Sequence, residues 1–346
     1  MNIYEQDIFS QPDDIRQALA YYEAQDYAKQ IRTLADKKYR AILLTGMGSS
    51  YCAAFNASTI LRNHGISCVA IPTSQLLSFE KASISRDTLL VMISQSGYSG
   101  EIVELIRCLE PNIMVVGLTN DPESPLGKRA DLLLPLHVQP EQAVSTRTYL
   151  APLALMHLFA HTFAGHDPGA IFQDLYRSLD YLAQSIQKFD TLSRDMEAFL
   201  GLPPYLALIG GGYSLTTVEA GALFIKEVAK YPSIAFDPGQ FRHGPFEMIG
   251  KDFAAMLFAN KGIGYESRLR LAADIAARGS KVVLVSDGND LPHDNNILVI
   301  RETYVSETLA CIGNILPTQA FGNYIAKAKG LEVGTFLFSN KITTAL

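Results

Sequence analysis

The sequence has few charged residues and no excess of basic ones, which argues against a nucleic-acid partner. Charged residues make up 18% of the 346 residues, and the formal net charge is −6. Proteins that bind nucleic acids usually present a basic stripe to the phosphate backbone. The 48% of hydrophobic residues is instead typical of a globular protein with large buried cores, and the length favours two domains.

Cysteine is also scarce, and the four that occur are scattered without the spacing of metal ligands. They are Cys52, Cys68, Cys108 and Cys311. All four stand among apolar residues, so we expect buried free thiols, as in a cytoplasmic protein. We expect neither a metal site nor an organic cofactor.

Targeting and membrane-spanning patterns are missing as well. Residues 1–7 have neither the basic nor the apolar part of a secretory signal. The longest apolar stretch, residues 149–165, is interrupted by His157 and His161, which favours a core helix over a membrane span. The sequence therefore predicts a cytoplasmic α/β protein with no membrane partner.

What the sequence does contain is a serine-rich turn at an informative place. Residues 94–99 follow the apolar run 88–93, which is typical of a buried strand, and precede a helical pattern through residue 109. We call residues 94–99 the serine turn. A strand, a hydroxyl-rich turn and the beginning of a helix in succession present free N–H groups and the positive end of the helix dipole. Both features suit a phosphate monoester. A helix N-cap with no ligand is the alternative interpretation.

A second turn strengthens the phosphate hypothesis. Gly46-Met47-Gly48-Ser49-Ser50-Tyr51 follows the predicted strand 41–45 and opens another helix. This glycine turn resembles part of a dinucleotide fingerprint, but the third glycine and the acidic residue after the next strand are missing. There is no Walker lysine either. A phosphosugar suits the two short hydroxyl turns better than a nucleotide.

The alternation of strands and helices repeats along the chain with an offset of about 165 residues. The strand and glycine turn at residues 205–214 repeat those that end at Tyr51, but residues 257–261 have no hydroxyls where the first copy has the serine turn. We therefore predict an α/β fold of two doubly wound parallel-sheet domains. The predicted segments are an N-terminal segment (1–25), domain 1 (26–167), a helical connector (168–200), domain 2 (201–328) and a C-terminal tail (329–346).

The second copy carries its own candidate residues. On a helix predicted from about residue 216 to 230, Thr216 and Glu219 have the spacing of a capping box. Glu227 falls in a largely apolar stretch of the same helix, where burial would raise its pKa toward that of a general base. The alternative is an exposed Glu227 paired with Lys226 or Lys230.

Two more candidates lie beyond that helix. His243 stands in a loop bounded by Pro and Gly, where it suits proton transfer near neutral pH, although a structural role fits equally well. Lys341 is the single lysine near the end of the apolar tail. It is either a solvated terminal lysine or an amine of lowered pKa that attacks a carbonyl.

Taken in order, these motifs resemble the sugar isomerase (SIS) domain family, specifically the double-SIS isomerase half of glucosamine-6-phosphate synthase. The resemblance runs from about residue 5 to the C-terminus. It rests on Gly48-Ser49-Ser50-Tyr51, Ser94-Gln95-Ser96-Gly97, Ser145-Thr146-Arg147, Lys226-Glu227, His243-Gly244-Pro245 and Lys341. It implies two flavodoxin-like SIS domains and a phosphosugar partner.

The resemblance also implies a role for each matching residue. Glu227 would be the base that moves a proton between C1 and C2, and His243 the ring-opening acid/base, contributed by the neighbouring subunit of a homodimer. Lys341 would form a Schiff base with the open-chain ketose. The phosphate and substrate contacts would come from Gly48, Ser49, Ser50, Ser94, Gln95, Ser96 and Ser99, and from the backbone around Ala143, Val144 and Ser145.

Departures from the synthase pattern direct the functional expectation. The glutaminase domain is absent from this sequence, Phe224 replaces a lysine, and Tyr98 replaces an acidic residue. The loop at residues 239–245 is similar to that of fructosamine-6-phosphate deglycases. We therefore expect an aminosugar-6-phosphate deaminase/isomerase. The alternatives are a fructosamine-6-phosphate deglycase, a simple aldose–ketose isomerase, and a non-catalytic phosphosugar-binding regulator.

Overall fold

The computed structural model describes residues 1–141, 143–338 and 340–344, and the chain divides into two compact units. The first-sheet unit comprises residues 10–176 and 337–346, and the second-sheet unit comprises residues 1–9 and 177–336. The predicted N-terminal segment, connector and tail are thus each shared between the units. The residue boundaries of the two predicted domains stay a prediction.

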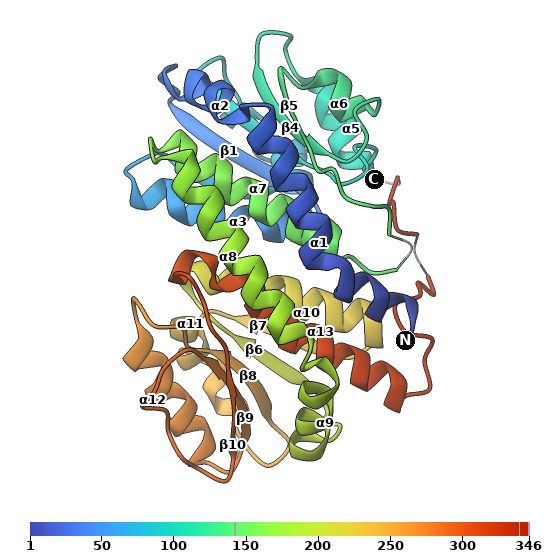
Figure 1. Cartoon of the computed structure of the whole chain (residues 1–346), viewed down its shortest axis with the longest axis vertical. Helices are drawn as coiled ribbons and strands as arrows, with labels where there is room; N and C mark the ends of the chain where they lie inside the picture. The colour runs from blue at the N-terminus through green and yellow to red at the C-terminus, as the bar shows by residue number, and fades with distance from the viewer. Residues whose placement is uncertain (142, 339, 345–346) are drawn as a thin grey trace. The chain divides into compact units, whose positions relative to one another are not determined.

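The first-sheet unit is built on five parallel strands in the order β2-β1-β3-β4-β5 (Figure 1). The strands are rich in Leu, Ile and Val, as expected of a parallel sheet covered on both faces. Their bounds are β1 Ala41–Gly46, β2 Cys68–Pro72, β3 Thr88–Ile93, β4 Met114–Thr119 and β5 Leu132–Pro135.

Helices cover both faces of this sheet. One face packs on α4, α5 and α6, and its core includes Leu43, Leu90, Ile102 and Leu105. The other face packs on α3, while α7 packs on α3 and α2 packs on α7. The bounds are α2 Tyr27–Ala35, α3 Gly48–Asn63, α4 Thr73–Ser78, η1 Lys81–Ser83, α5 Gly100–Cys108, α6 Pro125–Arg129 and α7 Arg147–Phe163. Helix α7 is buried over nearly its whole length, which confirms the prediction of a core helix there.

The second-sheet unit has five parallel strands in the order β10-β9-β8-β6-β7. Counted along the chain, both sheets therefore have the strand order 2-1-3-4-5, which is that of flavodoxin-like folds. Equivalent strands start 165 to 167 residues apart, so the predicted internal repeat is confirmed. The bounds are β6 Leu206–Ile209, β7 Ser233–Phe236, β8 Ala254–Phe258, β9 Lys281–Ser286 and β10 Ile297–Arg301.

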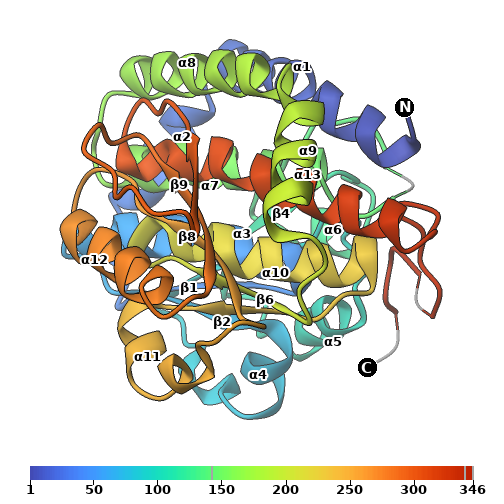
Figure 2. The same ribbon diagram turned by 90° about the horizontal axis from the view of Figure 1, so that it is seen from below.

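Its helices also lie on both faces of the sheet. Helices α11 and α12 pack on one face around Phe241, Leu257 and Ile275, while α9 and α10 pack on the other and α13 lies against both of them (Figure 2). The bounds are α9 Phe189–Leu200, η2 Gly212–Ser214, α10 Leu215–Ala229, α11 Pro238–Arg242, η3 Pro245–Met248, α12 Tyr265–Ala276, η4 Glu307–Leu309 and α13 Ala310–Ala328. Helices α1 (Ile3–Ala24) and α8 (Pro168–Ile186) each contribute residues to both units.

The structure confirms the prediction of buried free thiols for three of the four cysteines. Cys52, Cys68 and Cys311 are buried free thiols as predicted, but Cys108 is exposed. It is the last residue of α5, and the buried face of that helix is formed by Ile102 and Leu105. Cys108 lies outside this buried face, so its apolar neighbours in the sequence did not indicate that it is exposed.

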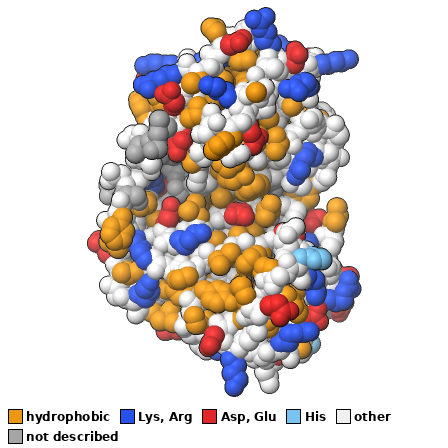
Figure 3. Space-filling view, turned by 180° about the vertical axis from the view of Figure 1, so that it is seen from behind, with side chains coloured by type: hydrophobic (Ala, Val, Ile, Leu, Met, Phe, Trp, Pro, Cys, Tyr) orange, Lys and Arg blue, Asp and Glu red, His pale blue; other side chains and the backbone are white. Residues whose placement is uncertain are grey.

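Two further features concern the predicted absence of nucleic-acid and membrane partners: the charges on the surface and the lengths of the helices. Acidic and basic side chains are interspersed on the face shown in Figure 3. Within the part of the chain that the structure describes, no helix combines the length and apolar character needed to cross a bilayer.

Candidate active site

The two predicted turns of the first repeat lie at the carboxyl ends of neighbouring strands. Strands β1 and β3 pair side by side, with Gly46 opposite Ile93, and the chain order reverses between them. Ligands of open α/β sheets bind in the crevice at such a reversal. A Cβ atom on Gly46 would lie 2.8 Å from the Ile93 carbonyl oxygen, so glycine permits this close approach. Gly48, Ser49 and Ser50 then form the first turn of α3.

The serine turn is held by its own hydroxyl groups. The Ser94 Oγ accepts a hydrogen bond from the Gly97 N–H at 3.1 Å and lies 3.1 Å from the Ser99 Oγ. The Ser96 Oγ accepts from the Tyr98 N–H. Two hydroxyls that share one hydrogen bond leave one O–H free to donate elsewhere. The pair of Ser94 and Ser99 can therefore donate to an oxyanion while keeping the turn in place.

Neighbouring strand β4 fixes the position of this turn. The Gln95 carbonyl accepts hydrogen bonds from the Asn120 N–H at 2.8 Å and from the Thr119 hydroxyl at 3.2 Å. Gly97 has a φ of 72°, and a Cβ there would lie 2.0 Å from the Ser124 Oγ. Only glycine fits both the backbone conformation and the space. The structure thus accounts for Ser94, Ser96 and Gly97 of the Ser-Gln-Ser-Gly sequence, with Ser99 as the N-cap residue of α5.

The C-terminal tail comes to the serine turn. The Thr343 carbonyl accepts a hydrogen bond from the Gly100 N–H, the first of α5, at 3.1 Å. Two residues earlier, the Lys341 Nζ donates to the Ala143 carbonyl at 2.7 Å and to the Glu141 carboxylate at 3.1 Å. Lys341 is therefore neither free nor fully solvated, since 20% of its side chain is exposed. The alternative of a solvated terminal lysine is wrong.

Glu141 is a site residue that the sequence analysis missed. Its side chain is fully buried and accepts hydrogen bonds from the N–H groups of Thr146 and Arg147 at 3.0 and 2.8 Å. The hydroxyls of Thr146 and Thr148 also donate to it. An anion at the start of α7 is favoured by the helix dipole. The signal in the sequence was a lone carboxylate a few residues before a helix that begins with hydroxyl residues.

The segment between Glu141 and α7 carries the three predicted sugar contacts. Ala143 and Val144 are buried and Ser145 is half-buried, directly before the N-cap Thr146. The Ala143 carbonyl is engaged by Lys341, so this backbone positions the lysine. Its predicted contact with a sugar stays a prediction.

Glu227 lies on α10 of the second-sheet unit, on the one incompletely buried stripe of that helix. The stripe comprises Leu215, Glu219, Leu223, Lys226, Glu227 and Lys230. Glu227 is half-buried and interacts electrostatically with Lys230, as in the paired alternative. Because it faces outward from a buried helix, it remains accessible to a ligand.

Glu219 lies on the same stripe, two turns before Glu227. Helix α10 starts at Leu215 after the N-cap Ser214, so Glu219 is inside the helix and does not form the capping box that its spacing suggested. Burial raises the pKa of the Glu219 carboxyl, and the charge of Lys226 opposes this effect. Glu219 is thus a half-buried carboxylate on the same stripe of the helix as Glu227.

His243 follows α11 as its C-cap residue and is exposed. The loop before it is ordered by Asp237, whose carboxylate accepts from the N–H groups of Gly239 and Gln240 at 2.8 and 3.0 Å. Arg242 is paired with Asp274 at 2.7 Å. An exposed imidazole on a rigid loop has no packing role, and it is available to a partner or substrate.

The structure therefore groups the candidates in two sets. The serine turn, the glycine turn, residues 143–145 and Lys341 belong to the first-sheet unit, whereas Glu227 and His243 belong to the second-sheet unit.

Comparison with known protein families agrees with this architecture. Residues 33–162 match the SIS domain. This stretch of the chain is therefore an SIS domain. Glutamine–fructose-6-phosphate aminotransferase of Pyrococcus horikoshii is 30% identical over 94% of this chain, and the corresponding enzyme of Pyrobaculum aerophilum is 26% identical over 94%. This SIS-domain protein spans about half the length of these relatives, namely 54% of each.

Solved structures of SIS proteins share the fold over nearly the whole chain. The C-terminal domain of glucosamine-fructose-6-phosphate aminotransferase from Francisella tularensis has a TM-score of 0.86 at 19% identity, covering 96% of this chain and 98% of that domain. Tagatose-6-phosphate ketose/aldose isomerase from Escherichia coli has a TM-score of 0.81 at 18% identity, covering 98% and 97%. Glucosamine-6-phosphate deaminase from Thermotoga maritima has a TM-score of 0.75 at 20% identity, covering 98% and 99%.

Proposed function

We propose that this SIS-domain protein is an enzyme that processes a hexose 6-phosphate carrying nitrogen, by deamination coupled to isomerisation. One observation carries the proposal. The tail that bears Lys341 is hydrogen-bonded through Thr343 to the first N–H of α5, at the serine turn. The first-sheet unit thus contains both an amine that could react and a turn suited to an anion. A phosphosugar that is held by its phosphate and reacts at its other end needs both.

The phosphate would bind at the serine turn. The N–H groups at the start of α5, the helix dipole and the free hydrogen of the Ser94–Ser99 pair favour an oxyanion there. Ser50, Gln95 and Ser96 would complete the contacts. The Thr343 carbonyl occupies one of these N–H groups, so phosphate binding and the position of the tail are coupled.

The reaction needs three kinds of step, each with a candidate group. His243, supplied by a neighbouring subunit, would open the ring by moving a proton to the ring oxygen, and Glu227 would carry a proton from C2 to C1. A second proton passes from the amine nitrogen to O1, which leaves an imine at C2 and a hydroxyl group at C1. The Lys341 Nζ would attack C2, ammonia would leave, and water would hydrolyse the resulting iminium. The sum is aminosugar 6-phosphate and water giving ketose 6-phosphate and ammonia.

The names of the relatives support the substrate class. A glutamine–fructose-6-phosphate aminotransferase, a glucosamine-6-phosphate deaminase and a tagatose-6-phosphate isomerase all take their names from hexose 6-phosphates. Two of the three names also include an amino group.

The direct test measures ammonia released from glucosamine 6-phosphate, beside amine released from a fructosamine 6-phosphate. Ammonia from the first substrate supports the deaminase. Amine from the second alone would replace it with a deglycase, and interconversion of aldose and ketose 6-phosphates alone would replace it with a simple isomerase. Phosphosugar binding without turnover of any of these would identify a binding regulator.

A single substitution separates enzyme from regulator. Glu227→Gln should lower turnover by orders of magnitude and leave phosphosugar affinity nearly unchanged, because the serine turn is intact. Glu247→Gln, an exposed carboxylate on η3, is the matched control. Full activity in Glu227→Gln would remove this residue from the mechanism.

A further inference from the structure

Charged side chains of alternating sign link α1 to the C-terminal tail inside the first-sheet unit. The Arg147 Nη1 lies 2.7 Å from the Asp14 carboxylate, and the Arg147 Nε lies 3.6 Å from the Glu141 carboxylate. The Lys341 Nζ lies 3.1 Å from the other oxygen of Glu141. We call these four residues the ion-pair network, which runs in the order Asp14, Arg147, Glu141 and Lys341.

Little water screens this network. The side chains of Asp14, Arg147 and Glu141 are exposed by 9%, 10% and 0%. Charges that are withdrawn from water interact more strongly, and are less screened by salt, than charges on a surface. Each charge of the network therefore affects the protonation of the lysine at its end.

The Glu141 carboxylate lies between the two cations and meets each with a different oxygen. Its Oε1 faces the Arg147 Nε, and its Oε2 accepts a hydrogen bond from the Lys341 Nζ. A carboxylate beside an amine favours the ammonium form, and a second cation on the same carboxylate opposes this effect. Arg147 therefore competes with Lys341 for one negative charge.

Asp14 decides how strongly Arg147 competes. It is buried on α1, where the Ser10 hydroxyl, one turn earlier, donates to its Oδ2 at 3.1 Å. The same oxygen accepts from the Arg147 Nη1 at 2.7 Å, a shorter contact than the 3.6 Å between Arg147 and Glu141. Asp14 thus balances most of the Arg147 charge, and the charge of Glu141 is left for Lys341.

We propose that Asp14 is a positioning residue that sets, through the ion-pair network, the fraction of Lys341 present as the free amine. Only the free amine has the lone pair that attacks a carbon atom. This role of Asp14 rests on the proposed function, in which the Lys341 Nζ attacks C2 of the substrate. Asp14 favours the ammonium form and thereby sets the lowest pH at which the lysine reacts.

Removing one or two members of the network should have opposite effects. Asp14→Asn leaves Arg147 without its nearest anion, so Arg147 balances Glu141 more fully. The ammonium of Lys341 is then less stabilised, and the free amine forms at lower pH. Asp14→Asn/Arg147→Met leaves Glu141 with the lysine as its one cation in the network, so the free amine forms at higher pH. This double variant also leaves no unpaired charge in the core.

The test measures the reactivity of Lys341 in the full chain against pH, by brief labelling with acetic anhydride and mass spectrometry of the tail peptide. The pH of half-maximal labelling reports the free amine without any substrate. It should fall by about half a pH unit in Asp14→Asn and rise by about half a pH unit in the double variant. Asp14→Glu keeps the charge and should restore the value of the parent chain.

Asp13→Asn is the matched control, because it makes the same substitution at the exposed neighbouring position of α1. It should be labelled like the parent. Urea unfolding checks that each variant folds, and if Asp14→Asn does not, the double variant decides alone. An unchanged pH of half-maximal labelling in the folded variants would overturn the proposal, because a purely structural ion pair does not alter the lysine.

Borohydride trapping with fructose 6-phosphate separates this proposal from the proposed function. Trapping at Lys341 that follows the same pH shifts supports both. Shifted labelling without any trapping in the parent chain would support the coupling of the charges and contradict the reaction proposed for the lysine. Trapping with unshifted labelling would support the reaction and overturn the role of Asp14.

Discussion

Among single residues, Glu141 links the largest number of candidate features. Its carboxylate holds the start of α7 and the ammonium of Lys341 at once. Six groups donate to two oxygen atoms in a fully buried position, so the carboxylate is held firmly. Its role is to position the lysine, because it already accepts as many hydrogen bonds as a carboxylate readily takes.

Glu141→Gln should therefore misplace Lys341. Removing one partner of a buried ion pair costs about 3 kcal/mol of unfolding free energy, and a misplaced reactive group loses about 100-fold in turnover. Borohydride trapping with fructose 6-phosphate should label Lys341 less in this variant than in the parent chain. Lys341→Met is the matched control, since it removes the amine and leaves Glu141 bonded to α7. Trapping equal to that of the parent would show that Glu141 does not position the lysine.

Gly97→Ala tests the serine turn through its backbone. The left-handed conformation costs an alanine about 1 kcal/mol, and the new Cβ would displace the Ser124 hydroxyl that caps α6, adding about 1 kcal/mol more. We expect a loss of about 2 kcal/mol in unfolding free energy and weaker binding of inorganic phosphate.

Gly65→Ala is the control for that substitution. Gly65 has a φ of 74°, but a Cβ there would have no atom within 4 Å. Gly65→Ala should lose only the conformational part of the unfolding free energy, about 1 kcal/mol, and should bind phosphate normally. Equal effects of the two variants on phosphate binding would mean that the serine turn is not the phosphate site.

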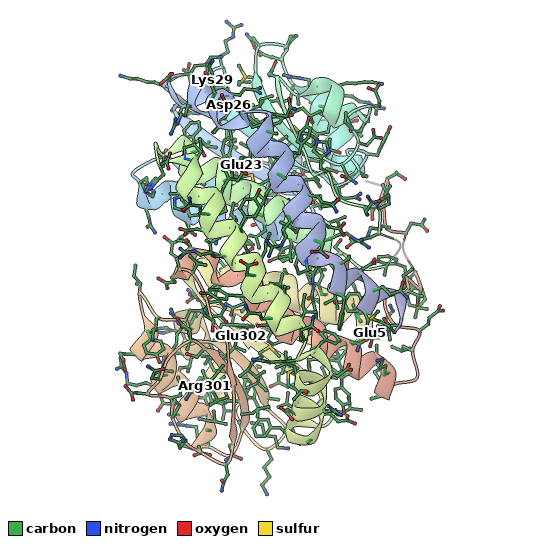
Figure 4. The ribbon with its side chains drawn as sticks, viewed as in Figure 1. Glu5, Glu23, Asp26, Lys29, Arg301 and Glu302 are labelled. Atoms are coloured by element: carbon green, nitrogen blue, oxygen red, sulfur yellow. The ribbon has the colours of Figure 1, made fainter. Side chains whose placement is uncertain are left out.

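The first helical turn of α1 shows how an element is joined to its unit. Asn2 and Glu5 form a reciprocal capping box: the Asn2 N–H donates to the Glu5 carboxylate at 2.9 Å, and the Glu5 N–H donates to the Asn2 side chain at 2.8 Å. Glu5, which is labelled in Figure 4, also accepts from Asn323 at 3.0 Å and pairs with Lys327, both on α13. The sequence pattern around residues 2–5 gave no sign of these distant partners.

This cluster predicts a pH-dependent contribution to stability. Burial raises the pKa of the Glu5 carboxyl, but hydrogen bonds from Lys327, Asn2 and Asn323 and the charge of Lys327 outweigh it, so the pKa is lowered from its usual value of 4.5. Because the pKa of Glu5 is lower in the folded chain than in the unfolded chain, its stabilisation is complete above the pKa of the unfolded chain. It is lost as the pH falls through the pKa of the folded chain.

Glu5→Gln should accordingly cost about 1–2 kcal/mol at pH 7, and the difference from the parent should shrink as the pH falls below about 4.5. Urea unfolding at several pH values measures it. Glu123→Gln, whose pair with Lys128 is exposed, should show no such dependence. A difference that stays constant down to pH 3 would contradict the assignment.

For the whole molecule, the two sheets have the same strand order but differ in what their strand ends carry. The first has the serine turn after β3. The equivalent turn after β8 begins with Asn260, whose side chain is bonded to Ser214 and Asn314 inside the second-sheet unit. The second repeat therefore has an internal polar network where the first has the proposed phosphate-binding turn, while Glu227 and His243 lie elsewhere in that unit.

The proposed exchange of His243 between subunits predicts complementation. A mixed dimer of His243→Ala and Lys341→Ala chains has one site with both defects and one site with neither, provided that His243 acts in the neighbouring site. After unfolding and refolding an equal mixture, activity should recover to about one quarter of the parent level, because half of the dimers are mixed. If His243 acts in its own subunit's site, every site is defective and the mixture stays inactive.

The periodicity and turn chemistry of this sequence determined the strands, the repeat and the serine turn. Helix and strand patterns depend on local burial, so strand β3 falls on the predicted residues 88–93. Residues 94–97 were informative because they directly follow that strand. Local patterns do not reveal which distant groups meet. The sequence therefore indicated neither the contact of Glu141 with Lys341, 200 residues apart, nor the exposure of Cys108. Only tertiary packing decides these, because it brings together side chains whose separation along the chain carries no local signal.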